Sequence, residues 1–343
     1  MADKKAQPAG KPAGCTAESS AGKSVYVQLL TEICAEEGIR LDSWSSDWAF
    51  RLTKGGRQAF ILGYQFGLNP ASVQQICTDK NITSEILRDS GIPCVPHSLV
   101  MSPSLLHYNG REGGYAKIFR ALERYGTIVL KDNVGTGGNQ VYLASTPAEA
   151  EYAASQIFQV SRSLAVCPCR DIRQEVRLVL LDGKIRLAFE KIRPSVTGDG
   201  SRTLGQLIGE ALAAGRPVGN VLPEGAALRR IPAQGEAVPL NWKHNLGQGA
   251  RPRLLTGPDL PAEAVSLAKA AARALSVRFA SVDVIRTDAG FEILEVNSGV
   301  MMEHFASCCA AYRHIAREIY RDAVRRMFEG SGERSEGGEN DQF

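Results

Sequence analysis

The chain lacks any long run of apolar residues. No segment of its 343 residues approaches the roughly 18 consecutive apolar residues that a membrane-spanning helix needs. The N-terminus also lacks the apolar core of a secretory signal. We therefore expect no membrane partner and a cytoplasmic location.

The chain also has little net charge and no cysteine framework. Its formal charge is +3, because 40 basic residues are interleaved with 37 acidic ones. A nucleic-acid-binding protein usually carries a one-sided basic surface, so we do not expect nucleic acid as a partner. The eight cysteines form no CxxC pair and no regular spacing, which is typical of reduced thiols.

Both ends of the chain have a biased composition. Residues 1–22 are rich in Ala, Pro, Lys, Gly and Ser, and residues 329–343 repeat Gly, Ser and Glu, so both are predicted to be a disordered leader and tail. Between them the patterns predict a small α/β pre-domain over 23–75, a central subdomain over 76–165 and a C-terminal subdomain over 166–328.

Hydrophobic periodicity and turn residues predict the main elements. The expected helices are 25–37, 72–90, 147–161, 203–214, 261–276 and 308–328. The expected strands are 47–53, 57–65, 95–100, 127–132, 139–144, 174–181 and 184–192, with a loop region over 215–255. Strand pairs that alternate with single helices predict an α+β fold with antiparallel sheets.

A hairpin is expected near the C-terminus. Two runs rich in Val and Ile, 280–285 and 291–297, are separated by turn residues. If the loop is the three residues 288–290, Thr287 pairs with Phe291. The two strands then face each other along their whole length.

This register places oxygen-bearing side chains together. Asp283 falls opposite Glu295, and Asn297 shares their face because alternate strand residues point the same way. Two neighbouring carboxylates repel each other unless a positive charge neutralises them, and oxygen ligands of this kind suit magnesium. The alternative is a pair of solvent-facing acids on an amphipathic hairpin.

A second feature lies upstream, where an apolar strand ending in Lys131 runs directly into a glycine-rich loop. Its glycines, Gly135, Gly137 and Gly138, would let backbone N–H groups approach a polyphosphate, and the lysine would add a positive charge. The GxxxxGK[ST] pattern is absent, because the lysine precedes the glycines. Taken alone, such a loop is weak evidence of phosphate binding and favours a plain turn.

Together these two features resemble the ATP-grasp superfamily of carboxylate–amine ligases, over roughly residues 75 to 300. Further segments fit in the same order. Residues 79–96 are similar to the family's entry segment, and 171–184 to the stretch after the adenine hinge. Residues 191–203 are similar to the "RxPAxVxGDGxxT" signature of cyanophycin synthetases and bifunctional glutathione synthetases, and 245–250 to their "NLSxGG" loop.

The resemblance implies an ATP-grasp fold, in which two α+β subdomains grip ATP, preceded here by the small pre-domain. It implies an ADP-forming ligase that joins a carboxylate, such as an amino acid or peptide, to an amine through an acyl phosphate. The implied cofactors are ATP and Mg²⁺. The implied site residues are Lys80 and Lys131 for the triphosphate, Gly135, Gly137 and Gly138 for a lid, Glu175 for the ribose, Asp283, Glu295 and Asn297 for magnesium, and Lys191 or Arg193 for the acyl phosphate.

The chain also departs from these relatives. Lys191 stands where they carry arginine and Arg193 where they carry proline, while Gln248 and Ala250 alter the second glycine-rich loop. These changes cluster where acceptor substrates usually bind, so the two substrates stay open. Two other functions stay open as well, a catalytically inactive ATP-binding regulator and an ATP-dependent phosphotransferase. A homodimer is a further option.

Overall fold

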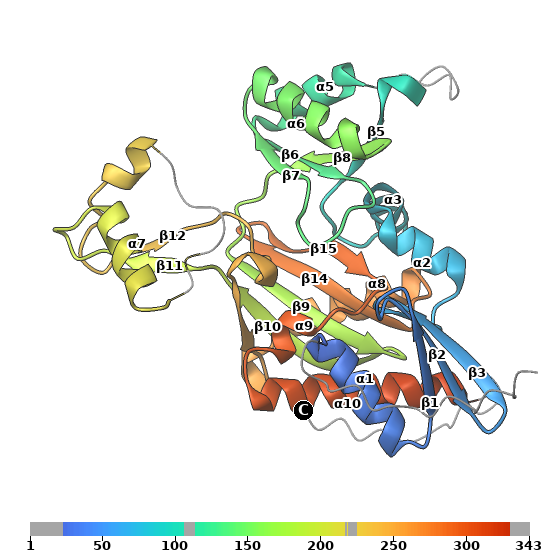
Figure 1. Cartoon of the computed structure of the whole chain (residues 1–343). Helices are drawn as coiled ribbons and strands as arrows, with labels where there is room; N and C mark the ends of the chain where they lie inside the picture. The colour runs from blue at the N-terminus through green and yellow to red at the C-terminus, as the bar shows by residue number, and fades with distance from the viewer. Residues whose placement is uncertain (1–22, 106–113, 217, 219–224, 330–343) are drawn as a thin grey trace, which may run out of the picture.

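The computed structural model describes residues 23–105, 114–216, 218 and 225–329. Figure 1 shows the pre-domain and the central subdomain beside the large sheet of the C-terminal subdomain, with a smaller lobe at the left. The predicted leader and nearly all of the predicted tail lie outside the described residues. None of the described helices combines the length and the apolar character that crossing a membrane requires.

The pre-domain consists of one helix and a four-stranded antiparallel sheet in the order β1-β2-β3-β4. Its elements are α1 (Val25–Glu36), β1 (Arg40–Trp44), β2 (Ala49–Lys54), β3 (Arg57–Leu62) and β4 (Gln65–Phe66). Two strands were predicted here, and the sheet has four. The turn between β1 and β2 contains Ser45, Ser46 and Asp47, all with positive φ, so the strand predicted from 47 starts at 49.

Two helices lead from the pre-domain to the central subdomain, α2 (Ala71–Thr78) and α3 (Lys80–Asp89). The sequence predicted one continuous helix over 72–90. Asp79 divides it because its backbone is extended and its carboxylate accepts a hydrogen bond from the Ile82 N–H, which caps α3. Lys80 therefore sits in the first turn of a new helix.

The central subdomain, at the top of Figure 1, is a four-stranded sheet in the order β5-β8-β6-β7, covered on one face by two helices. Its strands are β5 (Ser98–Met101), β6 (Ile128–Asp132), β7 (Val141–Ala144) and β8 (Ser163–Pro168), and its helices are α5 (Tyr115–Tyr125) and α6 (Pro147–Val160). Thr146 and Glu149 form a capping box with Pro147 in the first turn, which explains why the start of α6 was predicted closely. Strand β8 and helix α5 were missed.

The C-terminal subdomain is built on a five-stranded antiparallel sheet in the order β13-β10-β9-β14-β15. These strands are β9 (Gln174–Leu181), β10 (Lys184–Ile192), β13 (Arg251–Leu254), β14 (Phe279–Thr287) and β15 (Gly290–Asn297). Helix α8 (Ala262–Ala274) packs on one face, and α9 (Glu303–Ala306) and α10 (Ala310–Phe328) lie on the other.

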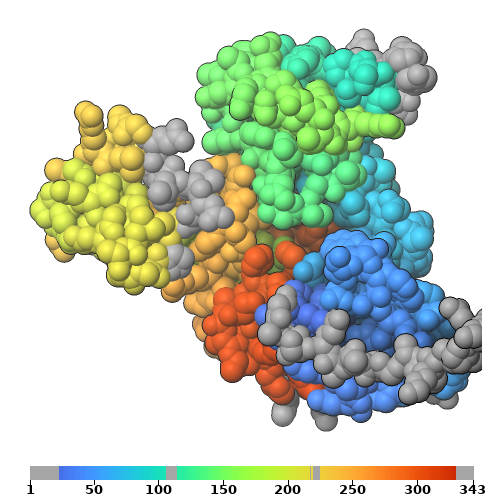
Figure 2. All heavy atoms as spheres, viewed as in Figure 1, coloured from blue at the N-terminus to red at the C-terminus, as the bar shows by residue number. Residues whose placement is uncertain are grey.

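Part of the predicted loop over 215–255 belongs to a small lobe together with the segment before it. In this lobe β11 (Ser195–Thr197) pairs with β12 (Ala237–Pro239), and α7 (Leu204–Ala213) packs on an apolar core of the lobe's own. Figure 2 shows this lobe, in yellow, projecting sideways from the rest of the molecule. The polar composition of the connecting stretches concealed the two short strands, β12 and β13.

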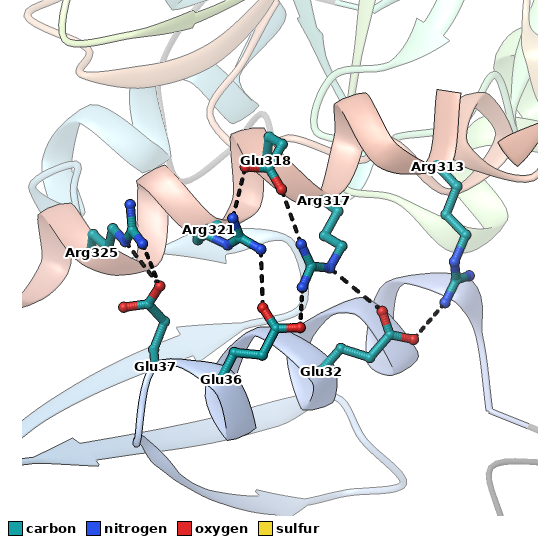
Figure 3. A network of polar contacts seen from close by, with 8 residues as sticks. All are labelled: Glu32, Glu36, Glu37, Arg313, Arg317, Glu318, Arg321 and Arg325. Atoms are coloured by element: carbon teal, nitrogen blue, oxygen red, sulfur yellow. Dashed lines mark hydrogen bonds and ion pairs between the residues drawn. The ribbon is translucent and has the colours of Figure 1, made fainter. Parts of the chain in front are cut away.

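Helices α1 and α10 hold the two ends of the described chain together. Their apolar sides share one core with β2, β3 and the C-terminal sheet, where Leu29, Leu30 and Ile33 meet Ile319 and Tyr320. Their polar edges form the α1–α10 ion-pair row (Figure 3). This row consists of Glu32, Glu36, Glu37, Arg313, Arg317, Glu318, Arg321 and Arg325.

Candidate active site

The hairpin acids lie where they were expected, although the hairpin loop is shorter than predicted. Thr287 pairs with Gly290 rather than with Phe291, so the turn has two residues instead of three. A β-bulge then leaves Leu294 unpaired on β15 and restores the predicted pairing of Asp283 with Glu295. The two departures cancel, and Asn297, opposite Ser281, stays on the same face.

Asp283 is the centre of a buried charge cluster, made of Glu175, Arg177, Lys191 and Asp283. Arg177 donates two hydrogen bonds to its carboxylate, 2.8 Å to Oδ1 and 2.7 Å to Oδ2, and Lys191 Nζ lies 2.9 Å from Oδ2. Burial alone would raise the pKa of Asp283, but the charges of Arg177 and Lys191 outweigh it and hold that pKa below its usual range. Asp283 is therefore a carboxylate.

Lys191 and Glu175 belong to the same buried cluster. Lys191 Nζ donates a 2.6 Å hydrogen bond to Glu175 Oε1, and both side chains are almost fully enclosed. The other oxygen, Glu175 Oε2, lies 3.4 Å from Nδ1 of His244, whose pKa is lowered mainly by burial. Glu175, which was predicted for the ribose, thus directly contacts Lys191, one of the two candidates for the acyl phosphate.

Lys80 contacts the hairpin from the start of α3, a helix whose apolar side packs into the core of the C-terminal sheet. Its ammonium lies 3.6 Å from Glu295 Oε1 and 2.5 Å from the carbonyl oxygen of Gly135 in the glycine loop. The side chain is 8% exposed, and this burial lowers the pKa of Lys80 despite the nearby Glu295 carboxylate. One lysine therefore contacts both a hairpin acid and the predicted lid.

Lys131 contacts a residue that the sequence did not single out. Its Nζ lies 3.2 Å from Nε2 of buried His97, whose Nδ1 lies 3.0 Å from the carbonyl oxygen of Val95. A carbonyl can only accept and an ammonium can only donate, so Nδ1 carries the proton and Nε2 accepts from the lysine. Burial, followed by the charge of Lys131, keeps the pKa of His97 well below its ordinary value, so the ring is neutral. The sequence did offer one signal for His97. It follows buried Val95 by two residues in the predicted strand 95–100, so strand alternation puts both side chains on the same face.

The two glycine-rich loops touch each other. The carbonyl oxygen of Gly138 accepts hydrogen bonds from Lys243 Nζ at 3.3 Å and Gln248 Nε2 at 3.4 Å. Gly138 has φ +76°, and a Cβ there would lie 2.9 Å from side-chain atoms of Asn245, so only glycine fits. Gln248 Oε1 is buried without a hydrogen-bond partner among the described residues, and an unpaired polar atom of this kind suits a ligand.

The remaining predicted residues lie near this centre. Arg193 is half-buried. Burial is the largest cause of the lowered pKa of His244, and the positive charge of Arg193 lowers that pKa further. Among the described residues its guanidinium makes no ion pair, in contrast to Lys191. Asn297 is half-buried at the end of β15.

The hairpin donors fit a magnesium ion in chemical type. Asp283, Glu295 and Asn297 supply two carboxylates and one amide oxygen on one face, which are the hard ligands that Mg²⁺ takes. Asp283 Oδ1 accepts one hydrogen bond and so keeps a free lone pair, while Glu295 is 30% exposed. Within the described part of the chain no three His, Cys, Asp and Glu side chains gather into a metal site, so Asn297 or other ligands must complete the shell.

Comparisons with known proteins show which proteins the chain resembles. No protein-family model matches the chain. Cyanophycin synthetases from Trichormus variabilis and Nostoc sp. are each 26% identical over 275 residues, and the match covers 71% of this chain and 29% of each relative. The chain thus spans less than a third of the length of these relatives.

Solved structures are similar at the level of the fold. A bifunctional glutathione synthetase from Pasteurella multocida superposes with a TM-score of 0.51 at 14% identity, covering 88% of this chain and 44% of that one. A D-alanine–D-alanine ligase from Bacillus anthracis gives a TM-score of 0.47 at 16% identity, covering 77% and 71%. The chain therefore has the ATP-grasp fold and resembles the ATP-dependent ligases that share it.

Proposed function

We propose that this protein is an ATP-dependent ligase. It would form an amide bond between a carboxylate, from an amino acid or peptide, and an amine, releasing ADP and phosphate. The observation that carries the proposal is the 3.6 Å contact between Lys80 and Glu295, together with the 2.5 Å contact between Lys80 and Gly135. Lys80 thereby connects the glycine loop of the central subdomain to an acid of the hairpin, and ATP would bridge such a pair of elements.

The chemistry explains why these groups are needed. A carboxylate is a poor electrophile, and direct attack by an amine would have to expel an oxide. Transfer of the γ-phosphoryl group to the carboxylate creates an acyl phosphate, from which phosphate can leave. Lys80 and Lys131 would hold the triphosphate and spread positive charge over the migrating group, while the glycine loop would exclude water. Magnesium, when bound at Asp283, Glu295 and Asn297, would neutralise the β- and γ-phosphates.

The contacts favour Arg193 over Lys191 as the group that faces the acyl phosphate. Lys191 is bonded to two carboxylates and would have to leave both of them, whereas the Arg193 guanidinium makes no ion pair among the described residues. We propose that Lys191 neutralises Glu175 and Asp283, and that Arg193 stabilises the developing negative charge. A cytoplasmic location is part of this proposal, and the oligomeric state stays open.

An isotope experiment tests the proposed reaction. Pairs of amino acids are screened for ADP release, with mass detection of the product, and the active carboxylate is then labelled with ¹⁸O. Attack of the amine on an acyl phosphate breaks the bond between carbon and the bridging oxygen, so the label must appear in the released phosphate. Hydroxylamine, added in place of the amine, should trap the acyl phosphate as a hydroxamate.

The alternatives give different results. A phosphotransferase would retain the label in a phosphorylated product, and an enzyme that forms an adenylate would release labelled AMP. A regulator without catalysis would bind ATP and release no ADP with any amino acid. The Lys131→Met variant, prepared in parallel, controls for contaminating ATPases, because their activity would survive that substitution.

A further inference from the structure

A cavity in the pre-domain is not used by the site described above. It has a volume of about 290 Å³ and lies between the start of α1, the β1–β2 turn and the β3–β4 turn. This is near the lower end of the size range of small-molecule sites. Its main lining side chains are Lys23, Tyr26, Ser46, Asp47, Trp48 and Tyr64.

Aromatic rings form one wall of this cavity. Trp48 and Tyr64 meet edge to face with their centroids 6.3 Å apart, and Tyr26 lies 4.7 Å from Tyr64. The Tyr26 hydroxyl donates a 2.9 Å hydrogen bond to the carbonyl oxygen of Gly63, which fixes the ring. Aromatic faces held in this way attract an ammonium group.

Two opposite charges line the same cavity. Asp47 and Lys23 both border it, and within the described residues neither side chain makes a hydrogen bond or an ion pair. A half-buried carboxylate gains most from a cationic ligand, and the ammonium of Lys23 gains from an anionic one. A molecule with an ammonium and a carboxylate close together matches both.

The turn that presents Asp47 is strained. Ser45, Ser46 and Asp47 have φ values of +54°, +55° and +61°, a left-handed run without glycine. Residues other than glycine, asparagine and aspartate avoid this region, and such strain is concentrated at binding and catalytic sites. The strain and the cavity are independent observations on the same residues.

The cavity is joined to the segment that follows the hairpin acids. The carbonyl oxygen of Tyr64 accepts a 3.1 Å hydrogen bond from the Val300 N–H, three residues after Asn297. The carboxylate of Glu303 accepts from the Val25 and Tyr26 N–H groups, both at 2.8 Å. The cavity wall is therefore fixed to the end of the candidate active site.

We propose that this cavity binds a free α-amino acid, with its ammonium facing Asp47 and the aromatic wall and its carboxylate facing Lys23. The inference rests on the proposed ligase function, for which the bound amino acid is one of the two substrates. It gives the pre-domain a role in substrate binding. The hairpin and the glycine loop alone do not explain what the pre-domain does in the reaction.

Tryptophan fluorescence tests the binding without turnover. The full chain, free of nucleotide, is titrated with each of the twenty amino acids in turn. At least one should change the emission, and Trp48→Phe should abolish that change. Trp44→Phe is the matched control. The two tryptophans are similarly exposed, Trp44 by 47% and Trp48 by 55%, and both lie in the β1–β2 hairpin region, but only Trp48 lines the cavity. No response to any amino acid overturns the proposal.

Charge variants identify the groups that recognise the ligand. Asp47→Asn keeps a residue that tolerates positive φ, and it should weaken binding about tenfold or more, as should Lys23→Gln. The N-acetyl derivative and the methyl ester of the bound amino acid should each bind at least about tenfold more weakly. Equal binding of the ester or the N-acetyl derivative overturns the assignment of the two charges.

Steady-state kinetics separate this inference from the proposed function. Both charge variants should raise the KM for one amino acid about tenfold, with the KM for ATP unchanged. Amino-acid-dependent ADP release with unaltered KM in both variants overturns the pocket and leaves the ligase standing. Fluorescence binding without any ADP release or hydroxamate overturns the ligase and leaves the pocket standing.

Discussion

Two clusters of acidic and basic side chains lie in very different surroundings in this chain. In the buried cluster, Arg177 and Lys191 enclose Asp283 at 2.7 to 2.9 Å, and water is almost excluded. In the α1–α10 ion-pair row, Arg317 and Glu36 also meet at short range, but the carboxylate is in solvent. Similar geometry therefore need not mean similar energy, because removing one buried partner leaves a charge that nothing can hydrate.

The difference also separates structure from function. The exposed row joins two helices that already share an apolar core, so each ion pair adds little. The buried cluster lies within the C-terminal sheet, where Asp283 pairs with both Arg177 and Glu295, and Glu295 in turn contacts Lys80. Buried charge at such a place indicates a site kept ready for charged ligands.

The largest effect is expected from Asp283→Asn. This change leaves Arg177 and Lys191 buried without their carboxylate, and should cost about 3–5 kcal/mol of stability. A carboxyl group with a lowered folded-state pKa contributes its full stability above its unfolded pKa of about 3.9 and loses it as the pH falls toward the folded value. Urea denaturation should therefore show a constant difference from the parent between about pH 5 and 8 and a smaller one below about pH 4.

A constant difference that persists below about pH 3 would contradict the charge argument and point to lost packing instead. Asp283→Leu tests the same point, since it removes the hydrogen-bond acceptor as well as the charge. It should be no more stable than Asp283→Asn.

Glu295→Gln comes next, because Glu295 lies at the open edge of the buried cluster. Its side chain is 30% exposed, so its loss should leave the melting temperature nearly unchanged. Magnesium-dependent turnover should fall by at least about a hundredfold, since the change removes one of the two proposed carboxylate ligands. Turnover close to the parent's at saturating magnesium would remove Glu295 from the metal site.

A smaller effect is expected for Lys131→Met, a cation paired with a neutral partner rather than with an acid. The substitution keeps the aliphatic stem and deletes the charge, so ATP affinity measured by calorimetry should fall about ten- to a hundredfold. Unchanged affinity would show that this lysine does not face phosphate.

His97→Leu supplies the matching control for Lys131. If His97 acts by orienting the ammonium of Lys131, the His97→Leu substitution should weaken ATP binding in the parent. The same substitution should have no further effect in Lys131→Met. Additive losses in this double-mutant cycle would give His97 a purely structural role. His97→Gln, which still offers an acceptor, should restore part of the affinity.

The smallest effect is expected from Glu36→Gln in the exposed row. Arg317 and Arg321 keep other carboxylate partners, and solvent screens the rest, so the melting temperature should change by about 2 °C or less. High salt should erase even this change. A drop as large as that of Asp283→Asn would show that burial does not explain the contrast between the two clusters.

Much of the fold could be predicted from local patterns. Alternating Val and Ile predicted the acid hairpin, and Thr146 with Glu149 marked the start of a helix. The three magnesium candidates were found because strand alternation places them on one face. The bulge at Leu294 could not be predicted, since it depends on how β14 and β15 pack against their neighbours.

Contacts between distant segments were harder to predict. The pairing of Lys191 with Asp283 requires the order of strands β10, β9 and β14, which no local pattern specifies. The same holds for Lys131 at the end of β6 and His97 just before β5, because β8 lies between these two strands in the sheet. Alternation from Val95 could place His97 on a buried face, but only the folded chain shows its contact with Lys131.

The contact between α1 and α10 has a consequence for synthesis on the ribosome. The apolar side of α1, with Leu29, Leu30 and Ile33, needs Ile319 and Tyr320 to complete its core. At about 5–20 residues per second, the intervening chain takes roughly 15 to 60 seconds to make. During that time the apolar side of α1 stays uncovered, so α10 completes a core that α1 begins long before α10 is made.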